Sequence, residues 1–237
     1  MRIPCEPLIP QMQHPLPSRD ARRTVRDPAP RRIGLLGGSF NPAHDGHRHI
    51  SLLALQRLGL DEVWWLVSPQ NPLKPAKGMA TLARRLESAR RAARHPRIWV
   101  SDIEQRLNTR FTVDTVRALK RRSPGCCFVW LIGADNLRQM PAWKSWETLF
   151  QSVAVAVFAR PSYSLRALAG RAAGRFAANR LPESEARCLA QKQPPAWVFL
   201  RIRLHPASAS AIRAAARKKK PGKAKATAKR GNRTARE

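Results

Sequence analysis

Residues 33–47 read IGLLGGSFNPAHDGH. A short apolar run ends at two glycines, and from about residue 46 to 58 polar and apolar residues mix with helical periodicity. Glycines at the end of a strand let the backbone turn sharply and approach a ligand closely. A helix that begins near Gly46 would aim its first N–H groups and its positive dipole end at the same space. The stretch predicts a strand, a phosphate-binding turn and a helix.

The rest of the chain continues the alternation of strand and helix. Further strands are expected at 63–67, 97–101, 127–132, 153–158 and 197–202, and further helices at 82–94, 111–122, 165–178 and from Ser208. This order predicts a single α/β domain of the Rossmann-like, doubly wound kind, with a mostly parallel sheet and helices on both faces. Ligands bind such sheets beyond the carboxyl ends of the strands. Four loops are expected there: 37–47, 68–74, 133–136 and 205–213.

Composition divides the 237 residues into three parts. Residues 1–31 are rich in Pro and Arg and are expected to form a flexible extension, residues 32–217 the domain, and residues 218–237 a disordered Lys/Arg-rich tail. The formal net charge is +30. The electrostatic field of this positive charge favours anionic ligands such as nucleotides or nucleic acid.

Several classes of protein are disfavoured by the same data. No apolar run approaches the roughly 20 residues that span a bilayer, and the prolines near the N-terminus interrupt any secretory signal. The four cysteines show neither disulfide-framework nor zinc-site spacing. We expect a reduced, cytoplasmic protein without membrane contact, and both a monomer and a homo-oligomer stay open.

His44 and His47 are three residues apart, a spacing that places side chains on one face of a helix. Two imidazoles there could donate hydrogen bonds to the oxygens of a polyphosphate. Taken alone, the pair would be better explained by capping or surface histidines. A zinc site is a weaker competitor because no third ligand lies nearby in the sequence.

The segment GGSFNPAHDGH (37–47) resembles the signature of the HxGH nucleotidyltransferases, in the spelling of their nicotinate mononucleotide adenylyltransferase branch. Asn41 stands where many members of that branch have Asp. The resemblance extends from about Ile33 to Arg217. It rests further on five short stretches, Ile132–Asn136 (IGADN), Trp143–Trp146 (WKSW), Asn71–Lys74 (NPLK), Thr112–Thr115 (TVDT) and Ser208–Arg213 (SASAIR).

The resemblance implies transfer of AMP from ATP to nicotinate mononucleotide, with release of pyrophosphate, in NAD biosynthesis. Mg²⁺ would be held mainly by the phosphates, and no protein-held metal and no covalent intermediate are expected. The catalytic residues implied are His44, His47 and Arg213. Those implied at ATP and its phosphates are Gly37, Gly38, Ser39, Phe40, Lys74, Gly133, Asp135, Ser208, Ser210 and Ile212. Those implied at the acceptor are Asn71, Thr112 and Trp143.

For several of these residues an ordinary structural role competes. Thr112 could simply begin a helix, Lys74 could be an exposed lysine, and Trp143 could pack in the core as readily as stack on a pyridinium ring. Trp146 is expected in the core.

Alternative functions remain at this point. Nicotinamide mononucleotide is a rival acceptor, and phosphopantetheine adenylyltransferases share the HxGH loop. A class I aminoacyl-tRNA synthetase would need a longer chain. From another class, a basic nucleic-acid-binding protein would explain the charged ends, and even an enzyme is expected to make weak nucleic-acid contact through its tail.

Overall fold

The protein is described here by a computed structural model. It describes residues 29–70, 78–160, 163–203, 205–207 and 209–218. Nearly all of the N-terminal extension and of the basic tail lie outside the described residues, as do Asn71, Lys74 and Ser208.

Within the described residues, seven strands form one sheet in the order β3-β2-β1-β4-β5-β7-β6, and every pairing is parallel. The strands are β1 (Arg31–Gly38), β2 (Glu62–Val67), β3 (Ile98–Ser101), β4 (Cys126–Gly133), β5 (Ala154–Phe158), β6 (Arg180–Leu181) and β7 (Trp197–Leu200). Parallel strands are covered on both faces, which is why they could be predicted from continuous apolar runs.

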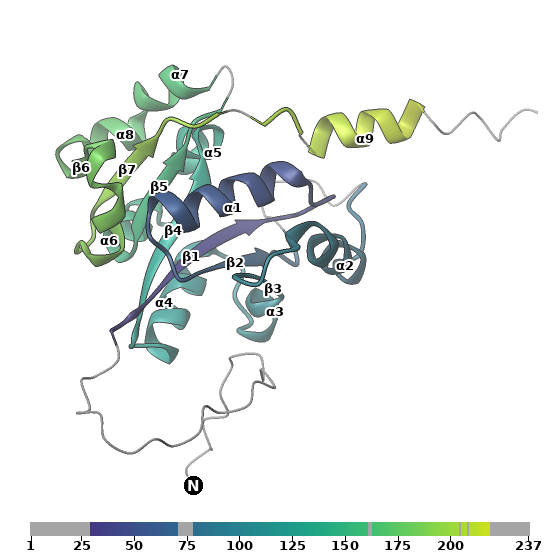
Figure 1. Cartoon of the computed structure of the whole chain (residues 1–237), viewed down its shortest axis with the longest axis horizontal. Coiled ribbons are helices and arrows are strands. Elements are labelled where there is room, and N and C mark those ends of the chain that lie inside the picture. Colours follow the sequence, from purple (N-terminus) through teal and green to yellow (C-terminus); the bar gives the residue numbers. More distant parts are fainter. Residues whose placement is uncertain (1–28, 71–77, 161–162, 204, 208, 219–237) are drawn as a thin grey trace, which may run out of the picture.

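Helices cover both faces of this sheet (Figure 1). The α-helices are α1 (Asp45–Arg57), α2 (Leu82–Ala93), α3 (Ile103–Arg106), α4 (Thr112–Arg122), α5 (Ala134–Gln139), α6 (Trp146–Ser152), α7 (Ser164–Leu168), α8 (Arg171–Arg175) and α9 (Ala209–Lys218). The 3-10 segments are η1 (Met140–Ala142), η2 (Ala177–Asn179) and η3 (Glu183–Gln191).

Two apolar clusters form the core, one on each face of the sheet. Successive residues of a strand point to opposite faces, so Leu35 joins one cluster and Leu36 the other. Helices α1 and α2 and segment η3 pack in the cluster of Leu36, and helices α3 to α8 in that of Leu35. The predicted doubly wound α/β fold is confirmed, and Trp146 is buried in the core as expected.

The strand order reverses between β1 and β4. From β1 the chain runs outward through β2 and β3, and from β4 it builds the other half of the sheet. The connections that follow β1 and β4 therefore diverge and leave a crevice at the carboxyl ends of these strands. Gly37 and Gly38 end β1 and Gly133 ends β4, so three predicted site residues meet at this crevice.

The helix predicted over 165–178 is wrong as a single element. The structure divides this stretch into α7, α8 and η2. Gly170 separates the first two with an extended backbone (φ −80°, ψ 162°) and precedes the first residue of α8. The alanine-rich periodicity favoured one helix, but glycine lowers helix propensity by roughly 1 kcal/mol, and here the chain turns at it.

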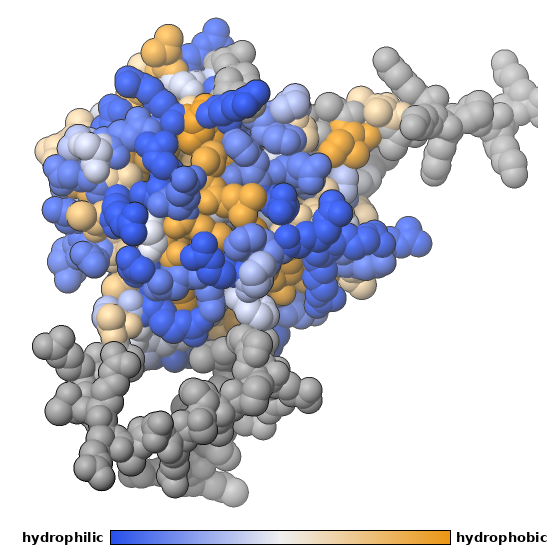
Figure 2. Space-filling model, in the orientation of Figure 1, coloured by the Kyte–Doolittle hydropathy of each residue, from blue (hydrophilic) through white to orange (hydrophobic). Residues whose placement is uncertain are grey.

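Figure 2 shows one face of the molecule, with polar and charged residues around its periphery and apolar residues gathered near its centre. Among the described residues, no helix combines the length and the apolar character needed to cross a membrane.

Candidate active site

Two adjoining cavities open at the crevice between β1 and β4. The first, of about 510 Å³, is called the histidine cavity. Its lining includes Leu36, Gly37, Gly38, Ser39, Phe40, Asn41, His44, His47, Ile50, Gly78, Met79, Gly133, Asp135, Asn136, Arg160, Ala209, Ser210 and Arg213. The second, of about 390 Å³, is called the tryptophan cavity. Its lining includes Gly37, Gly38, Ser68, Glu104, Arg110, Phe111, Thr112, Trp130, Asn136, Gln139, Ala142, Trp143 and Lys144. Gly37, Gly38 and Asn136 line both.

Glycines at the strand ends make room for side chains that line the cavities. A Cβ added at Gly37 would lie 2.6 Å from the Trp130 ring, and one at Gly133 would lie 2.4 Å from Asp135 Oδ1. Both distances are far below van der Waals contact. These two glycines thus allow Trp130 and Asp135 to pack directly against the strand ends.

His44 and His47 begin helix α1 as a reciprocal cap. The N–H of Gly46 donates to His44 Nδ1 at 3.1 Å, and the N–H of His44 donates to His47 Nδ1 at 3.2 Å. An acceptor nitrogen carries no proton, so in each neutral ring the proton is on Nε2. The capping interpretation and the polyphosphate interpretation are therefore compatible: Nδ1 orients each ring, and Nε2–H is the donor that the ring can offer to a ligand.

The His47 ring is packed among aromatic side chains. Its centroid lies 4.8 Å from that of Phe40 and 5.8 Å from that of Trp65, while Phe40 and Trp65 stack at 5.1 Å. The buried hydroxyl of Ser51 donates to the carbonyl of His47 and accepts from Trp65 Nε1, both at 2.8 Å. These ring contacts and hydrogen bonds tie the first turn of α1 to β2. Phe40 itself adopts φ +46°, a backbone conformation that is unfavourable for a bulky residue.

His44 is neutral near pH 7. Burial lowers the pKa of its imidazole to about 4, and the positive charge of Arg160 and the nearby His205 act in the same direction. Asp45 opposes them with a smaller effect. The Nε2–H of His44 is therefore a neutral donor throughout the physiological pH range.

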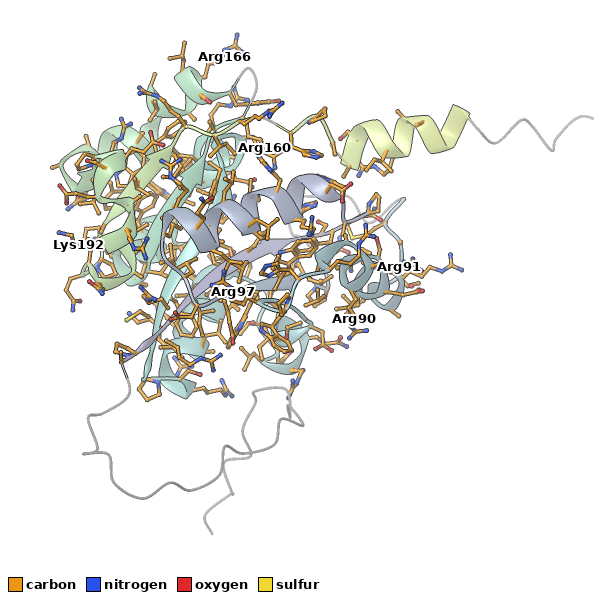
Figure 3. All side chains as sticks on the ribbon, viewed as in Figure 1. Arg90, Arg91, Arg97, Arg160, Arg166 and Lys192 are labelled. Carbon is orange, nitrogen blue, oxygen red and sulfur yellow. The ribbon has the colours of Figure 1, made fainter. Side chains whose placement is uncertain are left out.

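Three polar atoms of the histidine cavity are buried without a hydrogen-bond partner among the described residues: Ser39 Oγ, Asp135 Oδ1 and Arg160 Nε. The last two lie 3.6 Å apart, within ion-pair distance but too far for a good hydrogen bond. In Figure 3, Arg160 lies close to α1, whereas Arg91 and Arg166 point outward at the periphery. Buried polar atoms without a hydrogen-bond partner are suited to form hydrogen bonds with the polar atoms of a ligand.

The start of α9 closes the histidine cavity from the C-terminal end of the domain. Arg213 donates from Nη1 to the carbonyl of Asn41 at 2.7 Å and from Nη2 to Ser210 Oγ at 3.3 Å. Ser210 and Arg213 both line the cavity. Ile212 is not among its lining residues, and 37% of its surface is exposed.

Asn41 fastens the loop between β1 and α1 to the segment before α2. Its Nδ2 donates to the carbonyl of Gly78, and its Oδ1 accepts from the N–H of Ala80, both at 3.2 Å. An aspartate could make only the second of these bonds. The amide at this position thus has a structural use in this chain.

The tryptophan cavity combines aromatic walls with two cations. Trp143 is half-buried in its lining, and Trp130 Nε1 is buried without a hydrogen-bond partner in the part of the chain that the structure describes. Lys144 Nζ lies 4.3 Å from the centroid of the Phe111 ring, and the guanidinium carbon of Arg110 lies 5.7 Å from it. Thr112 is the first residue of α4, where helix N–H groups have no partner within the helix. The cavity therefore suits a flat ring that carries a negative group.

Glu104 was not predicted, yet its side chain lines the tryptophan cavity while only 6% of the residue is exposed. Burial raises the pKa of its carboxyl to about 7, and a hydrogen bond with the Ser68 side chain partly opposes this. Near neutral pH the group is thus divided between its acid and its carboxylate form.

No group of three or more His, Cys, Asp or Glu side chains that could hold a metal occurs in the described part of the chain. The one carboxylate that lines the histidine cavity there, Asp135, lies beside Arg160. These residues do not fit a cation held by a protein cage, and they do fit one that is held through the oxygens of a phosphorylated ligand.

Comparison with known proteins assigns the chain to a family. The model of the cytidylyltransferase-like family matches residues 35–215. A "probable nicotinate-nucleotide adenylyltransferase" of Cereibacter sphaeroides is 52% identical over 185 residues, which cover 78% of this chain and 97% of that protein. A relative of the same name from Parvibaculum lavamentivorans is 53% identical over 180 residues, or 76% of this chain and 89% of the relative.

This chain belongs to the nicotinate-nucleotide adenylyltransferase family, within the cytidylyltransferase-like group. The resemblance stated from the HxGH segment is therefore confirmed. A solved structure of Plasmodium falciparum nicotinic acid mononucleotide adenylyltransferase, complexed with NaAD, has a TM-score of 0.58 and 18% identity. The match covers 78% of this chain and 83% of that one, and it supports the fold.

For a member of this family, sequence reasoning overlooked three residues of the site. Arg160 lies two residues beyond the end of β5, near the strand ends where ligands collect. Glu104 lies three residues beyond the end of β3. Arg85, described below, occupies the buried face of α2 together with Ala89. Strand-end position and an arginine on an apolar helical face were the signals available.

Proposed function

We propose that this chain transfers the AMP unit of ATP to nicotinate mononucleotide, giving nicotinic acid adenine dinucleotide and pyrophosphate. One observation carries the proposal: a cavity lined by donors suited to phosphate joins a cavity with aromatic and cationic walls, and both meet at Gly37 and Gly38. The names of the family members agree with it.

ATP would occupy the histidine cavity. The Nε2–H donors of His44 and His47 and the guanidinium of Arg213 would bind phosphate oxygens, and Ser39 Oγ and Ser210 Oγ are further donors. Asp135 Oδ1 would accept from ribose hydroxyls. The sequence resemblance adds Lys74 and Ser208 to the phosphate contacts. Mg²⁺, held mainly by the phosphates, would supply charge neutralisation.

The acceptor would occupy the tryptophan cavity. Trp143 would stack on the pyridinium ring, and the N–H groups at Thr112, with Arg110 and Lys144, would favour a carboxylate substituent. The lining holds two cations against one partly ionised carboxyl, that of Glu104, and this balance favours nicotinate over nicotinamide mononucleotide because a carboxamide has no negative charge to meet the cations. Asn71 joins this set from the resemblance alone.

The reaction would be an in-line attack by the acceptor's phosphate oxygen on the α-phosphorus of ATP. Such transfers are accelerated by positioning and by stabilising charge on the nonbridging and leaving oxygens. A neutral His44 with its proton fixed on Nε2 can donate to a developing negative charge without giving up its proton. No side chain needs to form a covalent intermediate.

Product formation with separate acceptors tests the proposal. ATP and Mg²⁺ would be supplied with nicotinate mononucleotide, nicotinamide mononucleotide or phosphopantetheine, and the adenylylated product measured. We expect a strong preference for nicotinate mononucleotide. Preference for another acceptor would refute the assignment of the tryptophan cavity. Absence of any product from folded protein would favour the nucleic-acid-binding alternative.

A matched pair of variants tests the phosphate role. His47→Ala should lower kcat by about 100-fold or more, the effect of removing one preorganised donor. His95→Ala, in the turn between α2 and β3, should leave turnover unchanged. Near-normal turnover of His47→Ala would refute the phosphate role.

We further propose, from the sequence, that the enzyme is cytoplasmic and that residues 1–31 and 218–237 are extensions of the catalytic domain 32–217.

A further inference from the structure

A buried arginine of helix α2 joins the walls of the two cavities. Arg85 is only 2% exposed. Its Nη1 donates to the carbonyls of Ser39 (2.8 Å) and Ser68 (2.6 Å). Its Nη2 donates to the carbonyl of Pro69 (2.8 Å), and its Nε to that of Ala80 (3.0 Å). All four acceptors are main-chain oxygens.

The carbonyl groups held by Arg85 come from two connections of the chain, the one between β1 and α1 and both ends of the one between β2 and α2. Ser39 belongs to the loop between β1 and α1 and lines the histidine cavity. Ser68 directly follows β2 and lines the tryptophan cavity. Ala80 lies shortly before α2 and is also bonded to Asn41. One guanidinium group therefore bonds to a residue in the wall of each cavity while lining neither itself.

Packing alone does not account for an arginine at this position. Its neighbours on the buried face of α2 are Leu86, Ala89 and Ala93. None of the ion pairs formed among the described residues includes Arg85, and burial lowers the pKa of its guanidinium. A buried charge without a charged partner is costly, and an apolar residue would avoid that cost. The planar fork of five N–H donors is what an apolar residue cannot supply.

We propose that Arg85 is a positioning residue of the transfer reaction: by holding Ser39 and Ser68 together, it sets the distance between bound ATP and the bound acceptor. This role rests on the proposed function. The attacking oxygen and the phosphorus must approach to about 3–3.5 Å in line, and a displacement of about 1 Å costs on the order of 100-fold in rate. Because Arg85 touches neither cavity, its loss should alter alignment more than the binding of either substrate alone.

Two variants of Arg85 and one of its neighbour test this role. Arg85→Lys keeps the charge but cannot reach four carbonyls, and Arg85→Met removes the charge and suits the apolar face of α2. Arg84→Met, at the exposed adjacent position of the same helix, is the matched control. The measurements are kcat, the Kd of ATP and of nicotinate mononucleotide determined separately by calorimetry, and the thermal transition of each variant.

We expect both Arg85 variants to lower kcat by about 100-fold while each Kd changes by less than about threefold, and Arg84→Met to behave as wild type. Unchanged kcat in folded Arg85 variants would overturn the proposal. So would a rise of either Kd in step with the loss of kcat, or loss of folding in both variants, because each would make the role purely structural. A wild-type chain that forms no dinucleotide would refute the proposed function itself and the Arg85 role with it.

Discussion

The main-chain N–H of His44 donates to Nδ1 of His47 across the first turn of α1, and the His44 ring in turn accepts from Gly46. The two rings lie 4.0 Å apart between centroids. Capping thereby fixes which nitrogen of each neutral ring carries the proton. For a free imidazole in water, the two neutral tautomers differ little in free energy. The orientation of both donors is thus built into the start of one helix.

This arrangement predicts the titration of His44. With its pKa lowered to about 4, the imidazole should show no change in its ¹⁵N shifts as the pH falls from 8 to about 5. Nδ1 should resonate as an unprotonated acceptor throughout. The same residue in urea-unfolded protein should titrate near 6.5. His44→Gln would identify the signal, and a midpoint above pH 6 in the folded protein would contradict the assignment.

The sign of the corresponding stability effect follows from the direction of this shift. The unfolded state binds a proton at His44 below about pH 6.5 while the folded state does not. This group therefore makes the free energy of unfolding decrease as the pH falls from 6.5 toward 4.

Gly37→Ala should disturb the tryptophan cavity. The new Cβ would meet the Trp130 ring, which is 2% exposed and has little room to move. We expect a loss of about 1–3 kcal/mol in the free energy of unfolding and a higher KM for the acceptor. Gly125→Ala is the control, since among the described residues no atom outside its chain neighbours lies within 4 Å of its added Cβ. Equal effects of the two substitutions, measured by denaturant titration, would contradict this account of Gly37.

Glu104→Gln should stabilise the protein at alkaline pH. The folded state keeps the Glu104 proton up to about pH 7, whereas an unfolded glutamate loses it near 4.5. Stability contributed by the protonated form is therefore lost as the pH rises from about 4.5 through 7. At 1.4 kcal/mol per pKa unit, the variant should exceed wild type by up to about 3 kcal/mol at pH 8.

That gain should shrink as the pH falls toward 5. Denaturant titrations at several pH values would measure it, with the exposed Glu87→Gln as a surface control. A difference between Glu104→Gln and wild type that does not depend on pH would refute the raised pKa.

Removal of residues 218–237 should reduce affinity for single-stranded nucleic acid and the salt dependence of that affinity. Residues 218–237 carry nine basic side chains and one acid, and cations release counterions from a phosphate backbone. Turnover and both KM values should be unchanged, because the lining residues of both cavities precede this segment. Filter binding at two salt concentrations and steady-state kinetics would decide; lost turnover with intact binding would assign the tail to catalysis.

The sheet could be predicted from the sequence because its strands are buried on both faces and consist of apolar runs such as Val63–Val67. The HxGH loop could be predicted because its residues are consecutive. Glu104 and Arg85 could not be assigned in this way, since each is one charged residue whose importance comes from distant partners. The apolar face of α2 separates Arg85 from Arg84, but the carbonyl partners of Arg85 at Ser39 and Ser68 are brought to it only by tertiary packing.

The hydrogen bond between Arg213 and Asn41 joins residues 172 positions apart in the chain. A nascent polypeptide that has just emerged past β4 already contains both histidines and most of the sheet, but it lacks the cation that closes their cavity. In the proposed function, ATP would therefore meet all of its contacts only after synthesis of the domain is nearly complete. Retention of the nucleotide would then be a property of the finished chain.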